Sequence, residues 1–153
     1  MRRNLIIIFL LTAVSLHAIR QIDLVFISMP NEMFPFLAPE YRAALLSAAH
    51  EHKTDSIDNY FGKKIYVRQL TDNYLQMQVA DSIIYDWLVK DSTVLFIQTV
   101  CAPQCHSKLD TYNFKWERQP DNISIPDCLS QDSLCFTQII VEADSLRFVH
   151  SKE

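Results

Sequence analysis

The sequence predicts an α+β domain in which an N-terminal helical segment packs on an antiparallel β-meander sheet. Apolar residues recur at helical spacing from Pro39 to about residue 52, and after Gly62 the apolar period falls to two, as in half-buried strands. The strand-like runs are joined by short connections, which favours antiparallel neighbours. Helices first and strands afterwards is the order of an α+β fold, with the helices on one face of the sheet.

Residues 1–18 have the pattern of a secretory signal peptide, which leaves residues 19–153 as one domain. Arg2 and Arg3 form a basic start, residues 5–14 are almost entirely apolar, and small or polar residues follow. The run is too short to span a bilayer comfortably. We expect cleavage after Ala18, with cleavage after Ser15 as the alternative. A buried N-terminal helix or an uncut anchor is the competing interpretation.

A signal peptide predicts an exported protein, placed in the periplasm, on the outer-membrane surface or in the medium. No second apolar run of membrane length follows, so we expect no membrane span in the mature chain. The net charge is −4, and loss of Arg2 and Arg3 leaves 12 basic against 18 acidic residues, or −6. This balance argues against nucleic acid as a partner. Gly62 is the one glycine, which excludes glycine-rich phosphate and dinucleotide loops, and we expect no cofactor.

The predicted elements begin with an extended apolar segment, residues 24–27. Pro39 then fits the first turn of a helix that should end between residues 52 and 55. One strand is expected to begin at Ile65. The later strands should cover residues 74–79, 83–89, 93–101, 108–116, 136–141 and 146–149, with a loop over residues 120–133. Residues 93–101 form the most apolar strand, which predicts a central position in the sheet.

The four cysteines predict two disulfides, because an exported chain meets oxidising conditions. Spacing favours Cys101–Cys105, across a three-residue turn, together with Cys128–Cys135. Two alternatives remain open: a metal site of Cys101, Cys105 and His106, or a redox dithiol formed by the first pair. We expect neither, because redox pairs are usually separated by two residues and lie at a helix start. No metal site is predicted.

The dipeptide Asp-Ser occurs five times, with its aspartates at positions 55, 81, 91, 132 and 144. Both residues bond to nearby backbone and favour turns, so we expect these dipeptides at hairpin turns. The functional alternative is O-glycosylation where an apolar residue follows. Four serines fit that pattern: Ser56, Ser82, Ser133 and Ser145.

No local motif identifies a catalytic residue, which lowers the expectation of an enzyme without excluding one. His50 and His52 lie two apart on a helix and make a poor metal pair, so they are expected to be solvated. The favoured function is a non-catalytic exported module that binds a protein, peptide or glycan. The alternative is a small secreted hydrolase or a thiol-redox protein. Four tyrosines are candidates for an aromatic binding face: Tyr66, Tyr74, Tyr85 and Tyr112. Alternatively, these tyrosines simply cover the sheet.

Several stretches between residues 24 and 116 carry a family resemblance. They are Val25-Phe26-Ile27-Ser28-Met29-Pro30 followed by Phe36-Leu37, Leu70-Thr71-Asp72-Asn73-Tyr74-Leu75, Asp91-Ser92-Thr93, and Thr99-Val100-Cys101-Ala102-Pro103-Gln104-Cys105 with Tyr112 and Trp116. In these stretches the chain resembles domain-of-unknown-function family 3256, an exported family of Bacteroides-type bacteria. The resemblance implies a bacterial envelope or secreted protein. It carries over no catalytic residue.

Overall fold

The computed structural model describes residues 20–52, 56–120, 123–126, 135–143 and 145–152. The predicted signal peptide therefore lies outside the described residues. Two helices come first, α1 (Gln21–Ser28) and α2 (Pro39–His50). The strands that follow are β1 (Ile57–Asp58), β2 (Lys64–Leu70), β3 (Tyr74–Ala80), β4 (Ile83–Lys90), β5 (Thr93–Cys101), β6 (Cys105–Asn113), β7 (Cys135–Glu142) and β8 (Ser145–Lys152). The predicted α+β class is confirmed.

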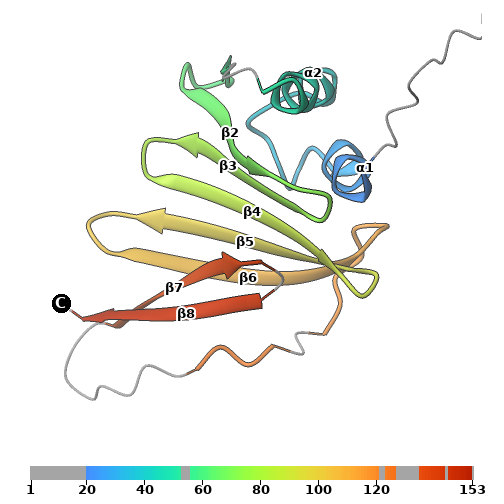
Figure 1. Cartoon of the computed structure of the whole chain (residues 1–153). Helices are drawn as coiled ribbons and strands as arrows, with labels where there is room; N and C mark the ends of the chain where they lie inside the picture. Colours follow the sequence, from blue (N-terminus) through green and yellow to red (C-terminus); the bar gives the residue numbers. More distant parts are fainter. Residues whose placement is uncertain (1–19, 53–55, 121–122, 127–134, 144, 153) are drawn as a thin grey trace, which may run out of the picture.

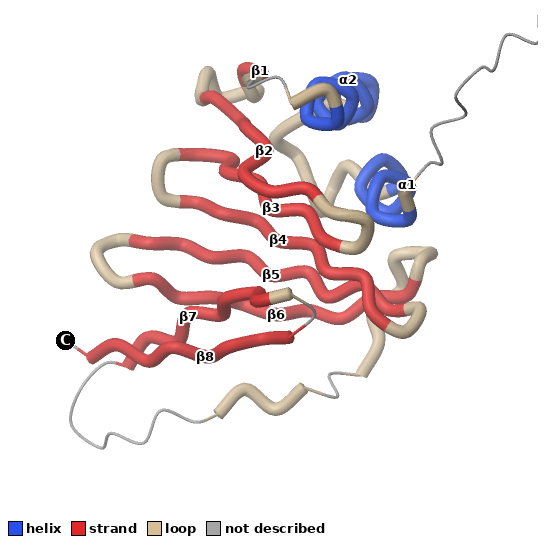
Figure 2. Tube along the Cα trace, viewed as in Figure 1, coloured by secondary structure: helices blue, strands red, loops and turns tan. Residues whose placement is uncertain are grey.

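Strands β1 to β6 form one antiparallel sheet in which the spatial order equals the chain order. This is the predicted meander, and Figure 1 shows it as successive arrows running from β2 to β6. Strands β7 and β8 pair with each other in a separate two-stranded sheet. Figure 2 shows that this hairpin lies against the β5–β6 side of the larger sheet, whereas the helices lie beside β2 to β4. The last two predicted strands are present, and they form this hairpin rather than further strands of the meander.

Each face of the six-stranded sheet has its own hydrophobic core. Alternate residues such as Leu75, Trp87 and Phe96 pack with α1 and α2 in the larger core. The residues between them, such as Leu88 and Leu95, face the other way and pack with Ile139 of β7. Strand β5 is apolar because both of its faces are covered. It is an inner strand, but it lies next to the edge strand β6 rather than at the centre of the sheet.

Residues 24–27 are helical and not extended, which corrects the prediction for the start of the domain. The buried apolar positions of α1 are Ile22, Val25 and Phe26, and Met29 follows at the same spacing. This is the period of a helix packed on one side. Leu24 and Ile27 are exposed apolar residues that fill the gaps in this pattern, and they make the segment resemble a continuous strand.

Strand β6 begins and ends three residues before the predicted strand. It starts directly after the turn at residues 102–104, and Cys101 pairs with Cys105 across that turn. It ends at Asn113, whose side-chain oxygen accepts hydrogen bonds from the backbone of Lys115 and Glu117. This capped turn, with Trp116 at a φ of 63°, replaces the expected continuation of the strand.

Two of the five Asp-Ser dipeptides are fully described, and both lie at hairpin turns, as predicted. Asp81-Ser82 joins β3 to β4, and Asp91-Ser92 joins β4 to β5. Asp91 and Ser92 have φ values of 48° and 66°, the left-handed pair that a tight hairpin requires. None of the described helices is long and apolar enough to cross a bilayer.

Candidate functional site

A pocket of about 560 Å³ lies between the segment that joins α1 to α2 and the loop that joins β1 to β2. We call it the linker pocket. It is lined by Asn31, Glu32, Phe34, Pro35, Leu37, Ala38, Pro39, Glu40 and Tyr60. Its volume is in the range of small-ligand sites, and the mixture of apolar side chains with a few polar ones is typical of them. Sequence reasoning did not select any of these residues as site residues.

The first wall of the pocket is the segment that joins α1 to α2, and Arg42 of α2 lies behind it and holds it in place. Its guanidinium donates hydrogen bonds to the backbone carbonyls of Met29, Phe34 and Leu37. It also donates to the side-chain oxygen of Asn31, at 3.0 Å. The side chain is fully buried, with the guanidinium carbon 5.4 Å from the centroid of the Phe34 ring. Four acceptors spread over residues 29–37 are thus bound to one planar donor group.

Burial lowers the pKa of Arg42 below its ordinary value, because a charge removed from water loses solvation, and nearby Tyr60 partly opposes this. A signal for this burial exists in the sequence. Arg42, Leu45 and Leu46 are spaced three and four residues apart, so they share one face of α2, and all three are buried. The signal is weak, because an arginine is ordinarily taken as solvent-facing when its neighbours in the fold are unknown.

The second wall is the loop that joins β1 to β2, and Asn59 holds it in the same way. Its side-chain nitrogen donates to the carbonyl of Val79 in β3, at 3.0 Å. Its side-chain oxygen accepts from the backbone of Phe61 and Lys63, at 2.8 and 3.0 Å. Gly62 closes this turn with a φ of 69°, where a side chain would be strained. The turn holds Tyr60 on the outside of the loop.

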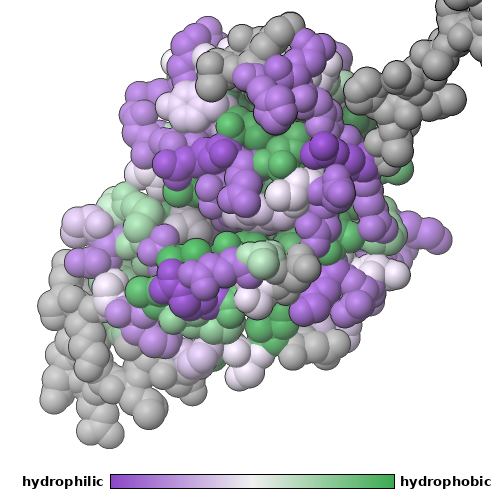
Figure 3. Space-filling view, viewed as in Figure 1, coloured by the Kyte–Doolittle hydropathy of each residue, from purple (hydrophilic) through white to green (hydrophobic). Residues whose placement is uncertain are grey.

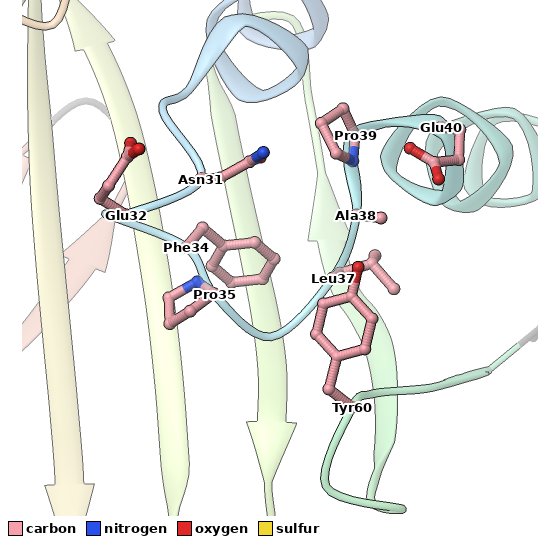
Figure 4. Close-up of a pocket in the computed structure, with 9 residues that line it drawn as sticks. All are labelled: Asn31, Glu32, Phe34, Pro35, Leu37, Ala38, Pro39, Glu40 and Tyr60. Atoms are coloured by element: carbon pink, nitrogen blue, oxygen red, sulfur yellow. The ribbon is translucent and has the colours of Figure 1, made fainter.

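The two walls meet at Tyr60, whose backbone N–H donates to the carbonyl of Phe36 at 3.3 Å. Figure 4 shows the Tyr60 ring directed toward the linker from one side and the Asn31 amide nitrogen directed into the pocket from the other. Glu32 and Glu40 lie at opposite ends of the same view. Tyr60 is 68% exposed, although its backbone is fixed by hydrogen bonds. The pocket therefore offers an aromatic ring, an amide donor and two carboxylates on backbone segments that hydrogen bonds hold in place.

The four tyrosines predicted to form an aromatic face do not lie together on one exposed surface. Tyr85 is buried in the core beneath the helices, where its ring contacts Phe34 and Phe36. Tyr74 is buried on the opposite face, and Tyr112 packs half-buried against Trp116. Tyr66 is 37% exposed. The predicted face is wrong as a single surface, because strand alternation and the two cores divide these residues.

A buried polar cluster surrounds Asp86 of β4 on the face opposite the helices. Its carboxylate accepts hydrogen bonds from the Tyr74 hydroxyl at 2.5 Å and the Gln76 amide at 2.8 Å. Burial raises the pKa of Asp86, and these two donors and the charge of Arg68 partly offset that effect. Burial and the adjacent carboxylate also raise the pKa of Tyr74. Figure 3 shows the molecule from the direction of Figure 1, with hydrophilic and hydrophobic side chains intermixed on that face.

The predicted Cys101–Cys105 disulfide is present and joins the ends of β5 and β6. Cys135 is also disulfide-bonded. Its predicted partner, Cys128, lies outside the described residues, so this pairing stays a prediction. The described residues contain no cluster of three or more metal-ligating side chains.

The remaining predicted residues are dispersed over the surface. Ser56 and Ser145 are exposed, Ser82 is half-buried in a turn, and Ser133 lies outside the described residues. Their glycosylation stays a prediction. His52 is exposed as expected, but His50 is not simply solvated. Its Nε2 lies 2.8 Å from a carboxylate oxygen of Asp23, which links α2 to α1.

Comparisons with known proteins agree with this picture of the fold. A family model described as "Protein of unknown function (DUF3256)" matches residues 13–144. A solved structure described as a domain of an uncharacterized protein from Porphyromonas gingivalis W83 is similar, with a TM-score of 0.67 and 18% sequence identity. The match covers 85% of this chain and 80% of that one. At that identity it shows the shared fold alone. No curated protein matches the sequence.

Proposed function

The chain belongs to the DUF3256 family, and from that premise we propose that it is an exported, non-catalytic binding module whose ligand occupies the linker pocket. One observation carries the proposal. An exposed tyrosine and an inward-facing amide are held at one pocket by two buried polar residues, Arg42 and Asn59. A site whose groups are fixed before the ligand arrives loses less conformational entropy on binding.

The groups at the pocket support binding more than catalysis. Its side-chain polar groups are one amide, one phenol and two exposed carboxylates, and among the described residues its lining holds no serine, cysteine, histidine or lysine. A serine or cysteine hydrolase needs a nucleophile next to a base, and the described lining lacks that pair. The thiol-redox alternative would use Cys101 and Cys105, which stand at strand ends and not at a helix start.

Export is supported by the basic start and apolar run of residues 1–18. Expression of the full chain in a bacterium with two membranes, followed by fractionation, tests this part. We expect the protein outside the cytoplasm with Ile19 as its first residue. Recovery of the chain in the cytoplasm with Met1 in place would contradict the proposal.

Binding at the linker pocket is tested by nuclear magnetic resonance on the mature chain, kept oxidised. The probes are neutral oligosaccharides, such as maltotriose and chitobiose, and short acidic, basic and proline-rich peptides. We expect at least one probe to shift the signals of Asn31 and Tyr60 saturably, and Tyr60→Ala to abolish the shift. Tyr66→Ala, which removes an exposed tyrosine elsewhere, is the matched control. If no probe shifts these signals, the proposed site is wrong.

A further inference from the structure

We infer that the linker pocket binds a neutral sugar ring of a glycan. This inference rests on the proposed function, because it names the ligand of the same site. It follows from two properties of the pocket: the opposing charges around it, and the kinds of side chain that reach its opening.

Charges of both signs lie around the pocket, so an ion of either sign would meet attraction and repulsion together. An anion would meet the carboxylates of Glu32 and Glu40, in a chain that already carries a net charge of −4. A cation would be attracted by these carboxylates but repelled by the guanidinium of Arg42, which contacts three residues of the lining from behind. No described carboxylate pairs with this guanidinium, and buried charges are screened less than exposed ones. Because attraction and repulsion oppose each other for either sign of charge, a neutral ligand that forms hydrogen bonds suits the pocket better.

The side chains at the opening match a sugar ring. A pyranose has an apolar face of C–H groups and a rim of hydroxyls that both donate and accept hydrogen bonds. Tyr60 offers a flat ring that is 68% exposed, against which the C–H face can lie. Glu32 and Glu40 can each accept from two hydroxyls, and the Asn31 amide can donate to another.

A proline-rich peptide is the neutral ligand that competes most closely with a sugar. Grooves for such peptides are lined by several aromatic side chains that grip successive turns of the extended peptide. In the lining of this pocket Phe34 is buried and Tyr60 is the one exposed aromatic residue. A single aromatic ring with acceptors at both ends suits one sugar unit better than a repeating peptide.

Isothermal titration of the oxidised mature chain with maltotriose, chitobiose and mannobiose tests the sugar, with a proline-rich peptide as comparison. We expect saturable binding of at least one oligosaccharide. Tyr60→Ala and Glu32→Gln should each weaken it tenfold or more, whereas Tyr66→Ala should change it less than twofold. Circular dichroism confirms that each variant is folded.

The outcomes separate this inference from the proposed function. If the proline-rich peptide binds and Tyr60→Ala abolishes that binding while no oligosaccharide binds, the sugar is wrong and the pocket remains a binding site. If an oligosaccharide binds equally well to Tyr60→Ala, the sugar contacts another surface and both statements fail. If neither kind of probe binds, the inference is wrong, and the proposed function is then decided by the acidic and basic peptides.

Discussion

At the scale of single residues, the linker pocket depends on Arg42, which binds four acceptors between residues 29 and 37. Replacing it with alanine leaves three buried carbonyls without donors and creates a cavity. We expect Arg42→Ala to lower the free energy of unfolding by about 3–5 kcal/mol in urea titrations. The free energy of unfolding of Arg42→Lys should lie between those of the wild type and Arg42→Ala, because an ammonium cannot reach four acceptors in one plane.

Arg147→Ala is the matched control for Arg42, because its side chain is about half exposed. We expect that variant to change the free energy of unfolding by less than about 0.5 kcal/mol. Equal effects of the two alanine variants would show that Arg42 does not organise the linker.

Asp86 predicts a pH dependence of stability. Its pKa is raised in the folded chain, so the folded state holds the proton more tightly than the unfolded state does. The stabilisation from this group is fully present below the unfolded pKa and is lost as pH rises through the folded value. Asp86→Asn keeps the acceptor oxygen for Tyr74 and Gln76. We therefore expect the variant to gain stability relative to the wild type as pH increases.

Urea titrations at several values between pH 4 and pH 8 measure this difference. Asp81→Asn is the control, since Asp81 is exposed. A stability difference between the wild type and Asp86→Asn that stays constant over that range would contradict the assigned direction.

At the scale of elements, α1 can be distinguished from the extended segment that its composition resembles. Phe26 is 0% exposed and Leu24 is 56% exposed, although the two lie on the same side of any strand. Phe26→Ala should cost about 3–5 kcal/mol of unfolding free energy, whereas Leu24→Ala should cost less than about 0.5 kcal/mol. Similar costs for both variants would restore the extended assignment.

The elements that the sequence predicted well are those with one dominant period. Strand β3 alternates, β4 and β5 are mostly apolar, and the bounds of all three fall within one residue of the prediction at each end. The α1 segment failed because exposed apolar residues hide its helical period. The predicted end of β6 was wrong because the Asn113 side chain caps a turn. The alternating pattern of the sequence continues to Trp116, but this turn ends the strand at Asn113.

At the scale of the whole molecule, Ser107 joins the two sheets. Its hydroxyl oxygen accepts from the backbone N–H of Ile139 in β7 at 2.9 Å and bonds to the Thr99 hydroxyl at 2.7 Å. Ser107→Ala leaves a buried N–H without its acceptor, which should cost about 1–3 kcal/mol in thermal or urea unfolding. Ser47→Ala, at an exposed position of α2, should have little effect. Equal stability of the two variants would show that this contact does not hold the hairpin.

The candidate site was the part least open to sequence reasoning. The tyrosines drew attention because they are large and lie on strands, yet two of them fill the cores. Tyr60 lies in a loop, and its importance depends on how that loop and the facing linker are held. Asn59 holds the loop through Val79 of β3, and Arg42 holds the linker through residues such as Phe34. Such contacts leave no local period, so only the folded arrangement reveals them.

The two cores share strands of one sheet but are covered by different elements, and this division has a consequence for how the molecule opens. The larger core includes both helices and the inner strands, whereas the β7–β8 hairpin contributes to the smaller one. Segments that bury less apolar surface open at a lower free energy. Amide protons of β7 should therefore exchange with deuterated solvent sooner than those of β3 and β4. We expect the hairpin to open first, while the helices and the linker pocket keep their native arrangement.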